Sequence, residues 1–246
     1  MGRFDGKVVL VTGGCRNTGL ALVEKFRREG AKVYTCDIGV EPSPGVFRCD
    51  ISDLAEVTAM FDAIEREAGR LDILVNNAAH QGIGKPFVEM DPAYVMEVLG
   101  VNVKGGFQVT QQAVNRFFLK QETRGVVVFL TSNTAMRAIR NRTAYCASKG
   151  AINSMVRTLA LDLGPLGIRV NACAPGYIYT ERWETLAEEK KARRRANCPL
   201  GREAKGSDIA NVVAFLASDD SGNMTGEIVT CDGGCSSQHM PVDVDV

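Results

Sequence analysis

Short runs of apolar, β-branched residues alternate along the chain with longer stretches in which apolar residues recur every three or four positions. The short runs predict strands at 7–12, 31–36, 46–49, 71–75, 125–131, 168–173 and 227–230. The longer stretches predict helices at 18–29, 53–68, 91–118, 143–163 and 207–217. Ser52 or Asp53 is expected to cap the second helix, and Gly100 and Gly105–Gly106 interrupt the pattern of the third.

The predicted strands are apolar throughout rather than at alternate residues, which is typical of a parallel sheet covered by helices on both faces. Right-handed crossovers then give an α/β fold with a doubly wound sheet of about seven strands, the Rossmann fold. No linker, repeat or low-complexity segment interrupts the pattern, so we expect a single domain over residues 1–246. Residues 235–246 are expected to form a C-terminal tail that is too short for a second domain.

The charge balance gives no sign of a nucleic-acid or membrane partner, because 29 basic residues match 29 acidic ones. A local basic run at 190–195 follows several glutamates and is expected to be a solvated helix face. No apolar stretch is long enough to span a bilayer, and no signal peptide begins the chain, so we expect a cytoplasmic protein. The eight cysteines form no C-x-x-C pair and the chain has two histidines, so we expect no metal site.

A glycine-rich loop at 12–19, with the sequence TGGCRNTG, joins the first predicted strand to the first predicted helix. Glycines at this place let the backbone turn tightly and approach a pyrophosphate at the positive end of a helix. A plain strand-to-helix turn needs fewer glycines. The loop therefore predicts a dinucleotide site, and the residues expected to contact the cofactor are Gly13, Arg16, Asn17, Thr18 and Gly19.

Asp37 follows the second predicted strand, about 18 residues after the loop. A carboxylate there accepts hydrogen bonds from both ribose hydroxyls and repels a 2′-phosphate, which favours NAD. Arg16 favours NADP instead, because a cation near this edge could pair with the 2′-phosphate. A further interpretation is that Asp37 is only a turn residue with no cofactor role. We expect NAD to be preferred over NADP.

Several motifs together resemble the short-chain dehydrogenase/reductase family, in its single-domain form, over about residues 5–234. They are the loop at 12–19, NNAA at 76–79, Asn102, Ser132, YCASK at 145–149 and PGYIYT at 175–180. The resemblance implies an NAD(P)-dependent oxidoreductase that acts on CH–OH groups and interconverts a secondary alcohol and a ketone by hydride transfer. It also implies a homotetramer built on the helices at 91–118 and 143–163 and on the last strand.

Tyr145 and Lys149 are four residues apart, so both project from one face of the predicted helix. A neighbouring ammonium favours the phenolate, so Lys149 is expected to lower the pKa of Tyr145 and make it a general acid/base. The resemblance implies that Lys149 also binds the nicotinamide ribose. It further implies that Ser132 polarises the substrate oxygen and that Asn102 holds a water in a proton relay.

The resemblance assigns further cofactor contacts. Asp50 would bind the adenine amino group beside Ile51, Asn76 and Ala78 would shape the strand end against the cofactor, and Pro175, Gly176, Ile178 and Thr180 would hold the nicotinamide. For Asn76, a structural bond between strands is the alternative. Two positions depart from the family pattern: Asn17 stands where glycine is usual, and Ala79 ends the NNAA motif. Asn tolerates a left-handed backbone better than most residues.

Residues 179–200 resemble the family's mobile lid over the substrate. We expect the substrate to meet His80, Gln81, Thr134, Arg142 and Trp183. These side chains suit a polyol, a sugar or a hydroxy acid, and a hydroxysteroid is a further candidate. One alternative is an NADPH-dependent 3-oxoacyl-carrier-protein reductase, against which Asp37 argues. Another is a nucleotide-sensing protein without catalysis, which should lack a member of the set Asn102, Ser132, Tyr145 and Lys149.

Overall fold

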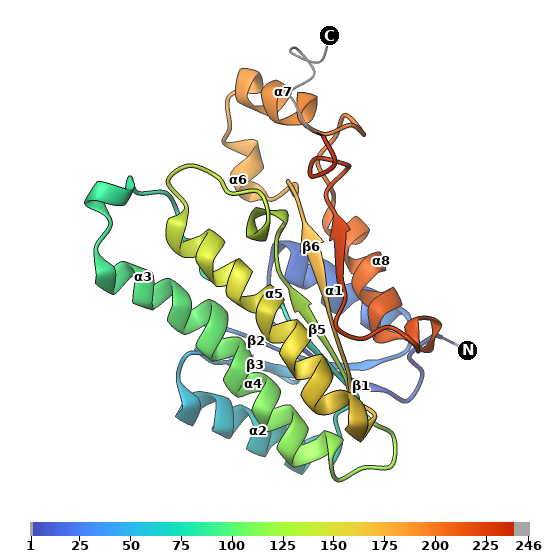
Figure 1. The fold of residues 1–246 in the computed structure, drawn as a ribbon. Helices are drawn as coiled ribbons and strands as arrows, with labels where there is room; N and C mark the ends of the chain where they lie inside the picture. Colours follow the sequence, from blue (N-terminus) through green and yellow to red (C-terminus); the bar gives the residue numbers. More distant parts are fainter. Residues whose placement is uncertain (1, 239–246) are drawn as a thin grey trace.

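The computed structural model describes residues 2–238 and shows seven parallel strands in the order β3-β2-β1-β4-β5-β6-β7 (Figure 1). The strands are β1 (Val8–Thr12), β2 (Lys32–Asp37), β3 (Val46–Arg48), β4 (Ile73–Asn76), β5 (Val126–Leu130), β6 (Arg169–Pro175) and β7 (Ile228–Cys231). The order runs outward in both directions from the pair β1 and β4, which makes the sheet doubly wound. The predicted Rossmann fold in one domain is therefore confirmed.

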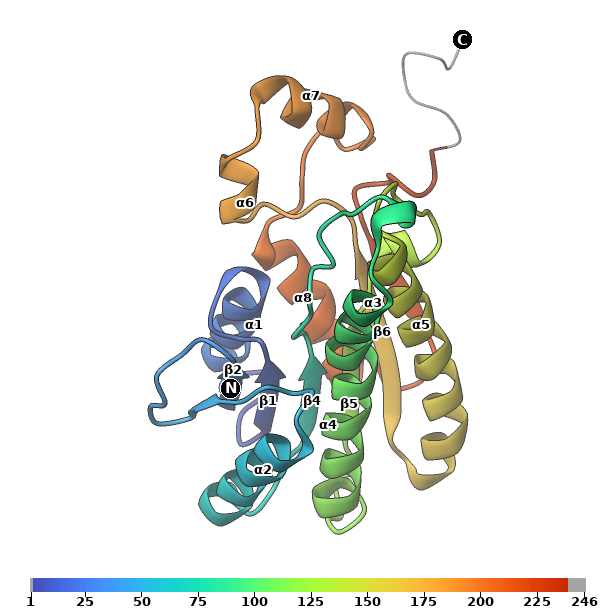
Figure 2. The same ribbon diagram turned by 90° about the vertical axis from the view of Figure 1, so that its left-hand side faces the viewer.

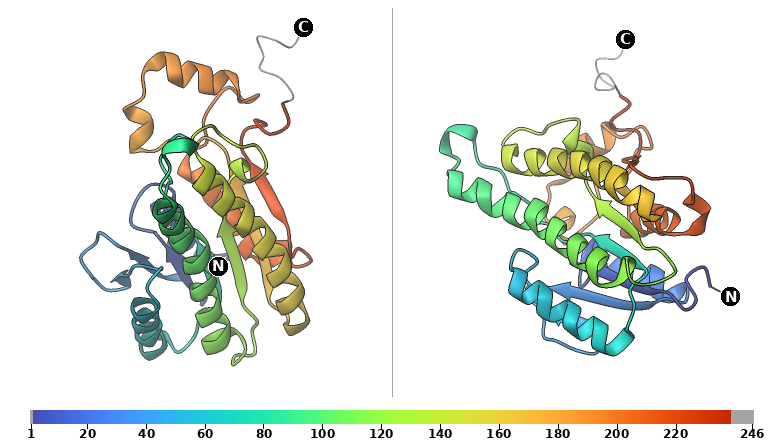
Figure 3. Two further views of the ribbon diagram at one scale, coloured as in Figure 1. Left: turned by 60° about the vertical axis from the view of Figure 1, so that its left-hand side comes forward. Right: turned by 60° about the horizontal axis from the view of Figure 1, so that its bottom comes forward.

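Helices cover both faces of the sheet. They are α1 (Asn17–Arg28), α2 (Leu54–Ala68), α3 (Pro92–Leu99), α4 (Gly106–Ala113), α5 (Thr143–Leu163), α6 (Glu181–Glu184), α7 (Glu188–Ala196) and α8 (Gly206–Ala217). Figures 2 and 3 show α2, α4 and α5 along one face, with α1 and α8 on the other. Short 3-10 turns occupy η1 (Phe87–Glu89), η4 (Asn133–Ala135), η5 (Gly164–Leu166) and η6 (Asp219–Ser221).

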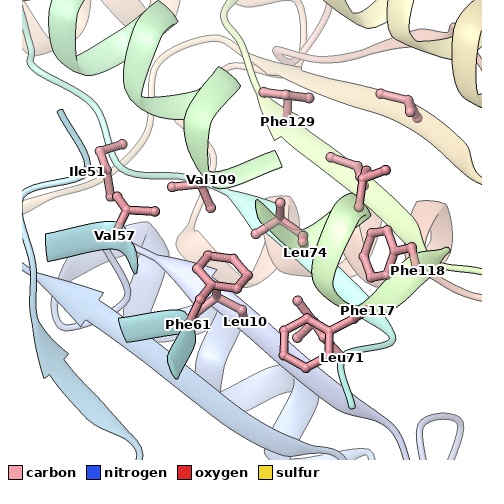
Figure 4. Close-up of a cluster of buried hydrophobic side chains, with 14 of the residues drawn as sticks. Leu10, Ile51, Val57, Phe61, Leu71, Leu74, Val109, Phe117, Phe118 and Phe129 are labelled. Carbon is pink, nitrogen blue, oxygen red and sulfur yellow. The ribbon is translucent and has the colours of Figure 1, made fainter. Parts of the chain in front are cut away.

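Two apolar clusters, one on each face of the sheet, form the core. Within β1, Leu10 points toward α2 and α4, whereas Val9 and Val11 point toward α1 and α8, since successive residues of a strand alternate faces. Figure 4 shows the first cluster, in which Leu10 and Phe61 lie among side chains from α2, β4 and the helix that follows α4. Both faces are thus buried, which explains why the strands are apolar without alternation.

The bounds of the predicted elements agree with the structure to within about two residues, whereas the short helix α6 was not predicted. The third predicted helix is continuous, and the pattern interrupted at Gly100 and Gly105–Gly106 corresponds to a change of helix type. There α3 continues through the π-helical segment η2 (Gly100–Gly105) into α4 and ends in a second such segment, η3 (Val114–Phe118). A π-helical turn inserts a residue into the helix and often occurs at a functional site. At the second helix, Asp53 rather than Ser52 is the cap, and its side chain accepts from two backbone N–H groups of α2.

Candidate active site

A cavity of about 1770 Å³ lies where the carboxyl ends of the strands meet. Ligands of open α/β sheets bind at this edge. Loops that follow β1 to β6 border the cavity, and α6 and α7 lie above the same edge (Figure 2). Every site residue that the sequence predicted lines the cavity except Asn76 and Asn102.

The loop after β1 has the geometry that a phosphate site requires. Gly13 has a φ of 65°, and a Cβ there would lie 2.8 Å from the Cα of Ala78, so a larger residue would not fit. Asn17 has a φ of 49° and begins α1, which places a left-handed residue where the family has glycine. The loop therefore keeps its turn despite this departure, and it faces the cavity beside Thr18 and Gly19.

The part of the cavity beside the loops after β2 and β3 is acidic. Asp37 is nearly buried, accepts from the N–H of Ile38 at 2.9 Å and lies 3.9 Å from the guanidinium of Arg16. Asp50 also lines the cavity, and its Oδ1 accepts from both the N–H and the hydroxyl of Ser52 at 2.8 Å. Ile51 is buried against Gly105 of η2. Asp37, Asp50 and Ile51 thus line the same cavity as the glycine-rich loop, and their contacts to ribose and adenine stay a prediction.

The predicted cofactor contact of Asn76 is wrong. Its side chain is buried and points away from the cavity, where Nδ2 donates to the Thr110 hydroxyl at 2.9 Å. The next residue, Asn77, lines the cavity instead, and its Nδ2 donates to the carbonyls of Thr12 and Gly13, both at 2.9 Å. Successive side chains of a strand point to opposite sides. The cavity side therefore belongs to Asn77, and the buried side to Asn76.

Tyr145 and Lys149 share one face of α5, as the spacing predicts. The Nζ of Lys149 lies 5.5 Å from the centre of the Tyr145 ring and donates to the carbonyl of Leu130 at 2.8 Å. Ser132 follows β5 and is buried beside them, with its hydroxyl accepting from the N–H of Thr134 at 3.2 Å. All three residues border the same cavity as the glycine-rich loop.

Burial sets the proton affinities of this pair. It raises the pKa of Tyr145 above its usual value, and the Ser132 hydroxyl and the Arg142 charge lower it by less. Burial also lowers the pKa of Lys149 from 10.5 to about 8, because the ammonium is out of contact with water. The expectation that Lys149 gives Tyr145 a depressed pKa is therefore wrong for the protein alone. Desolvation opposes the charged form of both groups.

Asn102 lies within η2 and is buried behind the cavity wall. Its Oδ1 accepts from the N–H of His80 at 2.7 Å, and its Nδ2 donates to the carbonyl of His80 at 3.1 Å and to the hydroxyl of Ser148 at 2.9 Å. The Asn102 side chain therefore links the loop after β4 to α5 by hydrogen bonds. Its contact on α5, Ser148, lies between Tyr145 and Lys149 in the sequence.

The loop after β6 forms another part of the cavity wall. Pro175, Gly176, Ile178 and Thr180 all line the cavity, and a Cβ on Gly176 would lie 2.6 Å from the Cβ of Asp232. Gly176 is thus required by close packing against the loop after β7. The contact of these residues with a nicotinamide stays a prediction.

The five residues predicted to meet the substrate gather on the other side of Tyr145. His80, Gln81, Thr134, Arg142 and Trp183 border the cavity. The sequence reading missed Arg182, Lys190 and Arg194, which border it too. Part of the basic run, expected to be a solvated face, therefore lies at the cavity. The position of the basic run inside the predicted lid at 179–200 could have indicated this, whereas the local charge pattern could not.

Two further features bear on the kind of protein this is. Within residues 2–238, no group of three His, Cys, Asp or Glu side chains is placed to hold a metal ion. No helix in the same part of the chain is both long and apolar enough to cross a membrane.

Known proteins resemble the chain over nearly its whole length. Residues 14–236 match the family described as "Enoyl-(Acyl carrier protein) reductase". A 3-oxoacyl-[acyl-carrier-protein] reductase of Thermotoga maritima is 35% identical, covering 94% of this chain and 98% of the relative. Galactitol 2-dehydrogenase of Agrobacterium fabrum is 34% identical over 94% of this chain and 98% of its own. The 3alpha-hydroxysteroid dehydrogenase of Mediterraneibacter gnavus is 36% identical over 95% and 98%.

Proposed function

Because the chain belongs to the short-chain dehydrogenase/reductase family, whose members are oxidoreductases that bind NAD(P), we propose that it interconverts a secondary alcohol and a ketone with Tyr145 as general acid/base. One observation carries the proposal. Tyr145, Ser132 and Lys149 border the same cavity as the glycine-rich loop, so a dinucleotide held by that loop reaches the three side chains. The tight packing of Gly13 against Ala78 fits a dinucleotide. Because Gly13 has no side chain, a pyrophosphate can approach the backbone of the loop closely.

The proton follows a short route in this proposal. When bound, the nicotinamide supplies the acceptor or donor of the hydride. During oxidation the alcohol O–H bond breaks and Tyr145 accepts the proton, while the C–H bond breaks with loss of the hydride; reduction reverses both transfers. Ser132 donates a hydrogen bond to the substrate oxygen, where charge develops. Lys149 lies near the phenol and stabilises its negative charge when the ammonium is present.

Asn102 takes a supporting part. Both N–H bonds of its Nδ2 are used within the protein, so a relay water would have to bond the remaining lone pair of Oδ1 or the main-chain carbonyl. The same bonds hold His80 and α5 together. We therefore assign Asn102 the positioning of the loop after β4 as well as the relay that the family resemblance suggests.

NAD is the cofactor that this site favours over NADP. Asp37 lies at the ribose end of the cavity and would repel a 2′-phosphate. Arg16, the cation that could compensate such a phosphate, lies 3.9 Å from the same carboxylate. That pairing reduces the positive charge available to a second anion.

The substrate belongs to the small alcohols and ketones that the cavity's polar side chains suit, namely a polyol, a sugar or a hydroxy acid, and a hydroxysteroid is a further candidate. The similarity to a galactitol dehydrogenase and to a hydroxysteroid dehydrogenase supports this range. A 3-oxoacyl-carrier-protein reductase is the second candidate, favoured by the similarity to the Thermotoga maritima enzyme and opposed by Asp37. We further propose that α6 and α7, within residues 179–200, act as a lid, and that the chain assembles as a homotetramer.

The test is a screen of secondary alcohols in which the ketone and the reduced nicotinamide are both measured. It is run with NAD and, separately, with NADP, at pH 7 and pH 9. We expect equimolar ketone and reduced nicotinamide, with a rate that rises with pH, because the raised pKa of Tyr145 leaves little phenolate at neutral pH. We expect kcat/KM for NAD to exceed that for NADP by at least about 10-fold, as a like-charge clash costs several kcal/mol. Turnover only of 3-oxoacyl thioesters with NADPH would favour the second candidate, and no hydride transfer to either nucleotide would exclude both.

A further inference from the structure

The substrate side of the cavity has an excess of positive side chains. Arg137, Arg142, Arg182, Lys190 and Arg194 border it, against two carboxylates, Glu97 and Glu181. Glu97 lies 3.4 Å from the His80 ring, and the N–H of Glu181 bonds to Asn17 on the phosphate loop at 3.4 Å. Neither carboxylate lies within ion-pair distance of the arginines. Positive charge is therefore left without an acidic partner on this side.

Arg142 is the member of this group nearest the reacting atoms. It immediately precedes α5, and its guanidinium carbon lies 5.9 Å from the centre of the Tyr145 ring. Its Nη1 donates to the carbonyls of Gln81 and Gly82, which anchors the side chain over the loop after β4. Its Nε and Nη2 donate to no group in residues 2–238, so three N–H bonds remain for a ligand.

Arg182 borders the same cavity as Arg142. Arg182 is exposed on α6, and its charge is felt by Arg142, whose pKa is lowered first by burial and then by Arg182. Within residues 2–238, neither guanidinium pairs with a carboxylate. Like charges at one cavity repel each other, and an anion bound between them would offset that repulsion.

Two buried polar atoms beside the same space also lack partners. Thr134 and Trp183 border the cavity and are more than nine-tenths buried. The hydroxyl of Thr134 and the Nε1 of Trp183 make no hydrogen bond within the described chain. Buried polar groups in folded proteins nearly always have a partner. Both atoms are covered by protein, so a ligand in the cavity does not reach them unless the side chains above them move.

We propose that the substrate carries an anionic group, a carboxylate or a phosphate, close to the carbon that reacts, and that Arg142 and Arg182 bind it. This inference rests on the proposed alcohol–ketone chemistry. It selects a class from the proposed range: hydroxy acids or sugar-like phosphates rather than neutral polyols, steroids or acyl thioesters.

The experiment compares substrates that differ only in charge. Lactate and 3-hydroxybutanoate are each paired with the methyl ester, and glycerol 3-phosphate with glycerol, all with saturating NAD. We expect kcat/KM to be about 10- to 100-fold higher for one anion than for its neutral partner, the range of one or two charge-assisted hydrogen bonds. The carboxylate and phosphate arms show which anion the site takes.

Arginine variants locate the effect. Arg142→Gln and Arg182→Gln should each reduce the charged-to-neutral ratio of kcat/KM by about 10-fold. Arg157→Gln, an exposed arginine of α5 away from the cavity, should leave the ratio unchanged. Trp183 is the single tryptophan of the chain, so its fluorescence gives a binding readout that needs no turnover: the anion should quench or shift it in the NADH complex and the ester should not.

The outcomes separate the two proposals. If no alcohol of either charge is oxidised, the proposed function fails. If the neutral partner reacts with NAD at the same kcat/KM as the anion, the anion site is wrong while the chemistry stands. The same holds if a 3-oxoacyl N-acetylcysteamine thioester is reduced by NADH as efficiently as the keto acid that corresponds to the anion. It is also wrong if the arginine variants leave the ratio unchanged, or if Arg182→Gln weakens NADH binding and leaves the substrate KM unaffected.

Discussion

At the scale of single residues, the buried ammonium of Lys149 is the most costly group in the cavity. It has one hydrogen bond, to the carbonyl of Leu130, and its pKa falls from 10.5 to about 8. A lysine with a depressed pKa in the folded state contributes stability above the unfolded value, and that stability is lost as the pH falls through about 8. At pH 7 the fold therefore holds a charge that the unfolded chain would hold more easily.

This argument predicts that Lys149→Met stabilises the protein without cofactor at pH 7. We expect a gain of roughly 1–2 kcal/mol, after allowing for the lost bond to Leu130, and hence a Tm higher by a few degrees. The gain should shrink as the pH rises from 8 toward 10, where the wild-type side chain becomes neutral in the fold. Calorimetry at both pH values is the measurement, and a variant less stable than wild type at pH 7 would refute the argument.

Residue chemistry was predictable from the sequence where it depended on local backbone or on helical spacing. The left-handed Asn17 and the common face of Tyr145 and Lys149 are examples. Predictions failed where a neighbour from another element decides. Asn76 turns toward Thr110 on α4, and burial by the whole fold sets the pKa of Tyr145. Neither neighbour can be identified from sequence spacing.

At the scale of elements, the helix from α3 to η3 serves both the site and the surface. Its π-helical turn η2 places Asn102 against His80 and Ser148. The sequence predicted one helix over 91–118 with its pattern interrupted at the glycines, but it did not show that the interruption would be a π-helical turn. Within this turn, Asn102 accepts a hydrogen bond from the N–H of His80, which is 22 residues away in the sequence. Local sequence spacing does not reveal such a contact.

The same helices expose apolar side chains. Met96 on α3, Phe107 on α4 and Leu161 on α5 are 66%, 46% and 76% exposed. Scattered exposed apolar residues are normal, but three on neighbouring helices suit a contact between chains. This observation supports the proposed homotetramer on α3, α4 and α5.

Light scattering on the purified protein should then give four times the 26.6 kDa chain mass. Leu161→Glu should shift the protein toward smaller species, because a carboxylate buried in an apolar contact costs several kcal/mol. Leu200→Glu, at an exposed leucine beyond α7, is the matched control and should keep the wild-type mass. A wild-type mass equal to one chain would rule out the assembly.

At the scale of the whole molecule, the parallel sheet explains why residues far apart in the sequence meet. All seven strands point the same way, so the loops after β1, β4, β5 and β6 gather at one edge. The fold followed from this rule and from the family motifs, which also predicted most of the residues that line the cavity. The basic side chains of α6 and α7 at the cavity were not predicted, because their position depends on how these two helices lie over the cavity (Figure 2).

The central claim is that Tyr145 transfers the proton in an NAD-linked alcohol oxidation, and one kinetic comparison tests it most directly. The rate of NADH formation is measured for wild type, Tyr145→Phe and Tyr34→Phe, of which the last removes a buried hydroxyl that has no partner and lies outside the cavity. Tyr145→Phe should lose about 100- to 10,000-fold in kcat, with the Kd for NADH changed by no more than about fivefold, and Tyr34→Phe should behave as wild type. A Tyr145→Phe enzyme that keeps wild-type turnover would contradict the account.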